Sequence, residues 1–119
     1  MRTPAVDVAF IGALVYHHPH LTPILQEHLD DQEGELLPHL AMADIERWIE
    51  DQWSGNQQDQ VLGLLAWMEA AYAAGDDVTE LIAVSFIEHL PYSGPGSDLR
   101  DALGPTMREY SDRLIAGSG

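Results

Sequence analysis

The sequence contains six histidines and no cysteine, so imidazole is the side chain best suited to bind a transition metal. Three of them, His17, His18 and His20, lie almost together, and imidazole nitrogens suit Zn, Ni or Cu. Two adjacent histidines do not readily point at one centre, however, and the sequence has no His-Glu-x-x-His or Glu-x-x-His pattern. We therefore predict histidines at helix ends and on the surface, with neither a bound metal nor a cofactor.

Paired carboxylates could act as general acid and base, and three adjacent pairs are present: Asp30–Asp31, Glu50–Asp51 and Asp76–Asp77. Adjacent side chains do not face each other on a helix, and the last pair suits a helix cap. No serine has the Gly-x-Ser-x-Gly context of a hydrolase, and Gly94-Pro95-Gly96 lacks the lysine of a phosphate-binding loop. We predict no catalytic residue and a protein that is not an enzyme.

The net charge of −15 is the most unusual property of the sequence. It argues against binding to nucleic acid or to an anionic membrane, because both need a basic surface. Residues 21–60 hold ten acidic residues and one arginine, whereas residues 91–119 have a net charge of only −1. This uneven distribution predicts an acidic surface that attracts a basic protein. The alternative is that the charge only keeps the protein soluble.

A candidate partner-binding surface follows from the acidic segment. Trp53 ends an acidic helix beside a glycine loop, and an exposed tryptophan there would be an interface anchor; the alternative is a large side chain at the edge of a small core. Trp48 and Ile45 instead lie on the stripe expected to face the core. The predicted partner-binding residues are Asp30, Asp31, Asp44, Glu46, Glu50, Asp51 and Trp53.

Helical periodicity and helix-end signals run along the whole chain, and no segment alternates with period two over a strand's length. We predict one all-α domain, a helical bundle or short array of five to seven helices. Thr22-Pro23 should start the second helix with a capping threonine, and Gly104-Pro105 should break the last one. Residues 116–119 should fray. The expected helices span about 4–16, 22–30, 36–53, 57–74, 78–90 and 97–115.

The longest apolar run, Val8–Tyr16, is shorter than the 20 or so residues that cross a bilayer. It also lacks the flanking charges and the cleavage site of an export signal. Together with the absence of cysteine, this predicts a cytoplasmic protein.

Several motifs resemble those of a family of small bacterial helical proteins. They are Leu36-Leu37-Pro38-His39 with the following Asp44, the helix Val84-Ser85-Phe86-Ile87-Glu88, and Leu103-Gly104-Pro105. The resemblance covers residues 36–105, and the family is similar to immunity proteins encoded beside polymorphic or contact-dependent toxins. It implies a helical fold and a protein-binding role, and it brings no catalytic residue.

These observations predict an acidic binding module, most concretely an immunity protein that blocks a basic toxin by occlusion. The surface from Glu27 to Asp59 would mask the site where a polyanionic substrate binds. The alternatives are a helical scaffold or adaptor subunit and, third, a histidine-based metal- or small-ligand-binding protein.

Overall fold

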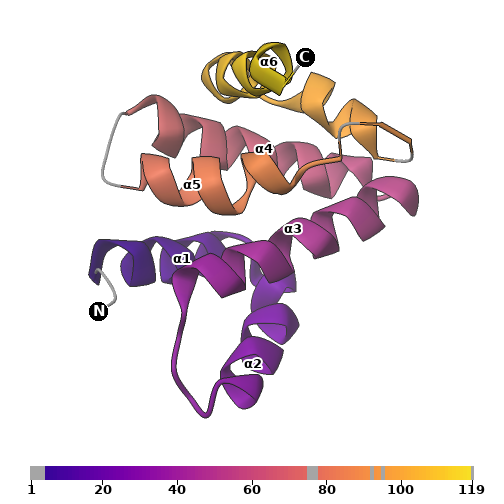
Figure 1. Ribbon diagram of the computed structural model, residues 1–119. Helices are drawn as coiled ribbons and strands as arrows, with labels where there is room; N and C mark the ends of the chain where they lie inside the picture. The colour runs from indigo at the N-terminus through magenta and orange to yellow at the C-terminus, as the bar shows by residue number, and fades with distance from the viewer. Residues whose placement is uncertain (1–4, 75–77, 92, 95, 119) are drawn as a thin grey trace.

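The helices of this protein are seen in a computed structural model, which describes the chain except residues 1–4, 75–77, 92, 95 and 119 (Figure 1). The described part consists of six α-helices and three short 3-10 helices, and no strand occurs in it. In chain order they are α1 (Ala5–His17), η1 (Pro19–Leu21), α2 (Thr22–Asp31), α3 (Pro38–Ser54), α4 (Gln58–Ala73), α5 (Thr79–Ser85), η2 (Ile87–His89), η3 (Ser97–Ala102) and α6 (Pro105–Ser118). The all-α prediction is confirmed.

Prolines and glycines lie at several helix ends, and the break predicted at Gly104-Pro105 is confirmed. Pro38 and Pro105 occupy the first positions of α3 and α6, where the missing N–H would have no helical partner. After α2, Glu33 and Gly34 take positive φ values of 56° and 85° and turn the chain away. The expected start at Pro4 lies outside the described residues. Helix α6 extends to Ser118, and the fraying expected over residues 116–119 stays a prediction.

The capping role predicted for Thr22 is wrong. Thr22 has helical φ and ψ values of −54° and −44°, and Leu21 occupies the cap position without a side-chain hydrogen bond. The cause is η1, which runs directly into α2, so that Thr22 already lies inside a continuous helical turn.

The helix predicted over 78–90 is shorter than expected, because α5 ends at Ser85 and Phe86 leaves the helical conformation with φ −122° and ψ −64°. Beyond this break, the guanidinium of Arg100 donates hydrogen bonds to the carbonyl oxygens of Leu90 at 2.6 Å and Pro91 at 3.0 Å. These bonds satisfy carbonyl groups directly after η2, which have no partner within a helix. The cap predicted at Asp76 or Asp77 lies outside the described residues.

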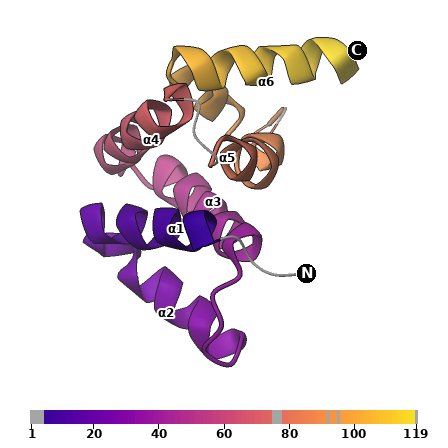
Figure 2. The same cartoon turned by 90° about the vertical axis from the view of Figure 1, so that its left-hand side faces the viewer.

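The helices are stacked in layers (Figures 1 and 2). In the orientation of Figure 1, α6 lies above the antiparallel pair α4 and α5, this pair lies above α1 and α3, and α2 is lowest. Buried hydrophobic side chains from α1, α3, α4, α5 and α6 form one shared core. The consequence for function is that α2 and the outward face of α3 lie at the opposite end of the molecule from α6.

A side chain of α4 joins the upper two layers. Glu69 accepts hydrogen bonds from the backbone N–H of Thr106 at 3.1 Å and of Met107 at 3.0 Å, and from the Thr106 hydroxyl. It thereby caps the N-terminus of α6, where backbone donors have no partner within the helix. Gly104 makes room for it, because a Cβ there would lie 2.3 Å from the Cγ of Glu69.

Candidate functional site: an acidic groove between α2 and α3

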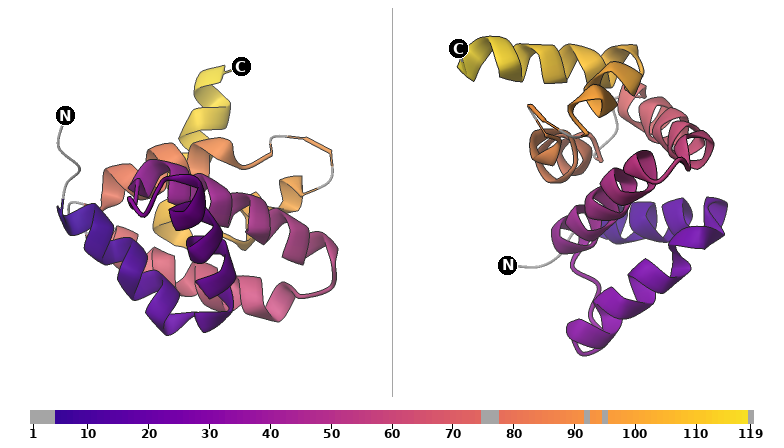
Figure 3. Two further views of the ribbon diagram at one scale, coloured as in Figure 1. Left: turned by 90° about the horizontal axis from the view of Figure 1, so that it is seen from below. Right: turned by 90° about the vertical axis from the view of Figure 1, so that its right-hand side faces the viewer.

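Helix α2, at the lower end of the molecule in Figure 1, crosses α3, and the left view of Figure 3 shows this helix pair from below. A groove lies between the two helices. Residues from both helices line it: Ile24, Glu27, Asp31, Asp44, Arg47, Trp48 and Asp51. We call this set the acidic groove. It contains four carboxylates and one arginine, and its apolar lining comes from an isoleucine and a tryptophan.

Helical spacing explains why these side chains share the groove. On α2, the positions 24, 27 and 31 follow the i, i+3, i+7 pattern of a single helix face, and on α3 the positions 44, 48 and 51 follow i, i+4, i+7. Each helix therefore presents one stripe, and the crossing of the two helices brings the stripes face to face.

A buried histidine holds the two helices in this arrangement. His28 of α2 has only 2% of its surface exposed, and its Nε2 accepts a hydrogen bond from the backbone N–H of Leu37 at 3.0 Å. In the neutral ring the proton therefore lies on Nδ1, which is 3.5 Å from an Asp44 oxygen of α3. His28 thus connects α2, the connecting loop and α3, and orients one of the groove carboxylates.

The four groove carboxylates differ in how far they are neutralised. Asp44 forms an ion pair with Arg47, one turn further along α3, and lies beside Nδ1 of His28. In the described part of the chain, no ion pair involves Glu27, Asp31 or Asp51, and all three are exposed. The negative potential of the groove therefore comes mainly from these three side chains.

The predicted partner-binding residues divide between the groove and other places. Asp31, Asp44 and Asp51 line the groove. Asp30 is exposed on α2 outside the groove lining and accepts a hydrogen bond from the side chain of Gln26 at 3.1 Å. Glu50 is half-buried. Glu27 and Trp48 also line the groove but are not among the predicted partner-binding residues, although their spacing of four positions from Asp31 and Asp44 could have revealed them.

Glu46 belongs to the predicted partner-binding set, but only 3% of its surface is exposed, so the surface position that this prediction requires is wrong. Burial raises the pKa of Glu46 to about 9, and a hydrogen bond with Glu50 and its negative charge act in the same direction, while Arg47 opposes them. Glu46 is therefore protonated at neutral pH. Its Oε2 atom is buried without a hydrogen-bond partner, so Glu46 contributes nothing to an acidic surface.

The two tryptophans of α3 are both half-buried and both pack against the core. Trp48, expected on the core stripe, lines the acidic groove, and Trp53, expected to be the exposed anchor, does not. The buried stripe of α3 passes through Met42, Ile45 and Ile49, which leaves position 48 at its edge. The aromatic side chain available to a partner in the groove is therefore Trp48.

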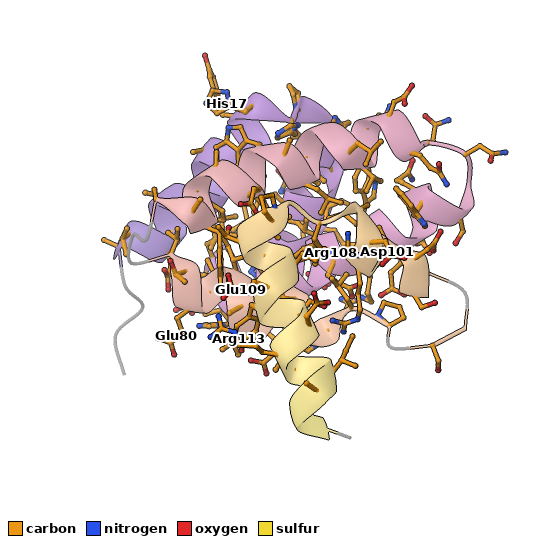
Figure 4. The ribbon with its side chains drawn as sticks, turned by 90° about the horizontal axis from the view of Figure 1, so that it is seen from above. His17, Glu80, Asp101, Arg108, Glu109 and Arg113 are labelled. Carbon is orange, nitrogen blue, oxygen red and sulfur yellow. The ribbon has the colours of Figure 1, made fainter. Side chains whose placement is uncertain are left out.

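The far end of the molecule has a different charge. Helix α6 carries two arginines and two acidic residues, and Figure 4 shows Arg108, Glu109 and Arg113 around this helix together with Asp101. Arg113 lies 3.8 Å from Glu109, and Arg108 lies 3.5 Å from Asp101. The negative charge is thus concentrated at the α2–α3 end, as the sequence predicts for residues 21–60.

Metal-binding clusters and membrane-spanning helices are both absent from the described residues. No group of three or more histidine, aspartate or glutamate side chains there could hold a metal ion. No described helix combines the length and the apolar character needed to cross a bilayer.

The fold and the groove together define an acidic all-α protein with a charged groove between α2 and α3. Over residues 11–117 the sequence matches the family described as a domain of unknown function, DUF7674, and the chain belongs to this family. No curated protein and no solved structure matches the chain. The family match is longer than the 36–105 segment that resembles immunity proteins, and it assigns no activity, so that resemblance stays a prediction.

Proposed function

We propose that this protein binds a basic partner protein through the acidic groove and, most concretely, that it is an immunity protein that neutralises a basic toxin by occlusion. The observation that carries the proposal is the meeting of Glu27, Asp31 and Asp51 beside Trp48, with no ion pair to these three carboxylates in the described part of the chain. Such a groove attracts a cationic segment over long range and offers an aromatic surface at contact.

Occlusion fits this arrangement better than catalysis. A groove that presents several carboxylates resembles the phosphates of a polyanion in charge, so it can cover the site where a basic toxin binds its substrate. Blocking a site needs complementary charge and shape, and it requires no reacting group. The acidic groove supplies negative charge, and its walls are two helices that His28 holds together.

The first test measures binding of a fluorescent peptide made of alternating lysine and arginine. We expect association that weakens strongly between 0.1 M and 1 M NaCl, as the Debye length falls from about 10 Å to about 3 Å. The double variant Asp31→Asn, Asp51→Asn should weaken binding roughly twofold to thirtyfold. The matched control, Asp98→Asn with Asp112→Asn, removes the same charge from exposed positions outside the groove and should have a much smaller effect.

The second test addresses the immunity role. If a neighbouring gene encodes a toxin, its product should bind this protein, and co-expression should protect cells unless Asp31 and Asp51 are neutralised. Binding that ignores both salt and these substitutions would contradict the groove mechanism and favour the scaffold or adaptor alternative. Glu46 is unsuitable for charge reversal, because a lysine at this buried position would disturb folding.

A further inference from the structure

An array of aromatic and imidazole rings adjoins the acidic groove. The ring of Trp67 in α4 lies 5.5 Å from His17 and 6.0 Å from His18, measured between ring centroids. His18 lies 5.8 Å from His20, and His20 lies 5.0 Å from Trp48. We call these five residues the aromatic band. It connects the end of α1, the turn into α2, and one side chain each of α3 and α4.

The band remains accessible although its tryptophans also pack against the core. His17 and His20 are exposed, while Trp48 and Trp67 are half-buried. Next to the band, Tyr16 has 81% of its surface exposed and its ring lies 5.5 Å from that of His17. Since Trp48 belongs both to the band and to the acidic groove, the two features form one continuous surface.

The groove already holds a cation of one particular chemistry. Arg47 belongs to its lining and pairs with Asp44 through its guanidinium group, although 66% of the Arg47 side chain stays exposed. A guanidinium thus pairs with one of the groove carboxylates, and this internal example indicates the chemistry that a partner would present.

We propose that the surface where the aromatic band meets the acidic groove selects arginine over lysine, so that the partner docks with arginine side chains. This inference rests on the proposed function. A guanidinium is planar, stacks on aromatic faces and can donate two parallel hydrogen bonds to one carboxylate. A lysine ammonium is a compact, strongly hydrated charge that gains less from a flat aromatic side chain. Asp31 and Asp51 supply carboxylates, and Trp48 supplies the ring.

The test compares two fluorescent peptides of equal charge, hexa-arginine and hexa-lysine, with the full-length wild-type protein. We expect hexa-arginine to bind about two- to fivefold more tightly for a single stacked guanidinium. Equal affinity for both peptides would overturn the arginine subsite and leave the basic-partner function standing. Failure of both peptides to bind at 0.1 M salt would instead contradict the proposed function itself.

Two variants locate the subsite. In Trp48→Leu the preference for arginine should fall to about one, whereas Trp53→Leu, which changes the other tryptophan of α3 outside the groove, should retain it. A preference that survives in a folded Trp48→Leu protein overturns the assignment. If that variant does not fold, Arg47→Gln serves in its place, because freeing Asp44 should tighten hexa-arginine binding more than Arg113→Gln does. Equal effects of these two substitutions, which change the charge alike, would also overturn it.

Discussion

Replacing Glu46 by glutamine should make the protein more stable at neutral and alkaline pH. Glu46 is almost fully buried, and its pKa is about 9 in the folded state, against a usual value of 4.5. Between pH 4.5 and pH 9, Glu46 keeps its proton in the folded protein but loses it in the unfolded chain, so unfolding releases one proton. The stability contribution of this group is complete below pH 4.5 and declines as the pH rises towards 9.

The magnitude follows from this proton count. One proton of difference changes the free energy of unfolding by about 1.36 kcal/mol for each pH unit. Between pH 5 and pH 8 the wild type should therefore lose up to about 4 kcal/mol from Glu46 alone, a large part of the 5–15 kcal/mol typical of a domain. A glutamine has nearly the same shape and no charge at any of these pH values, so Glu46→Gln should escape this loss.

The assay is urea unfolding of wild type and Glu46→Gln at half-unit pH steps from 5 to 8, followed by circular dichroism. Other groups titrate in both proteins, so the difference in unfolding free energy isolates position 46. Glu27→Gln removes an exposed carboxylate and should show no comparable trend. A difference between wild type and Glu46→Gln that stays constant with pH would falsify the buried, protonated state assigned to Glu46.

Three further predictions concern contacts that connect the layers, each measured by chemical denaturation. Glu69→Ala should destabilise by about 1–3 kcal/mol through loss of the α6 cap, and Gly104→Ala should cost less in that background than alone, because its Cβ would collide with the Glu69 side chain; additive effects would contradict the shared cap. His28→Phe should cost about 1–3 kcal/mol by leaving the Leu37 N–H unpaired, and an unchanged stability would refute its bridging role. Arg100→Met should cost at least about 2 kcal/mol, since carbonyl oxygens after η2 lose their donor; a smaller loss would show that water replaces the guanidinium.

Local sequence signals predicted the helices well where backbone chemistry alone sets their ends. Pro38, Pro105 and Gly34 act through a missing N–H or a positive φ, so their effects do not depend on distant residues. The end of α5 at Ser85 was not predictable in this way. No proline or glycine marks this end, and the segment that follows it is bonded by Arg100, fifteen positions after Ser85 in the sequence, through the carbonyl oxygens of Leu90 and Pro91.

The error at Glu46 has a different physical origin. Residue type places a glutamate on the solvent side of a helix, whereas periodicity places position 46 beside the buried Met42 and Ile49. The sequence-based prediction followed the residue type and ignored the helical periodicity. A glutamate can nevertheless occupy a buried position, because its carboxyl group can stay protonated there. An acidic residue at a core position of a helix is therefore better predicted as a neutral, buried carboxyl than as part of a charged surface.

The acidic groove was predictable as a set of charges but not as a surface. The concentration of acidic residues within 21–60 indicated the segment, and helix spacing could have grouped Asp44, Trp48 and Asp51. What local patterns do not contain is the direction in which α2 crosses α3. That direction depends on His28 and its two contacts, one with the Leu37 backbone and one with Asp44, which fold the connecting loop back against α3. Because these contacts decide which carboxylates face each other, a change at His28 should alter partner binding even though His28 is too deeply buried to touch the partner.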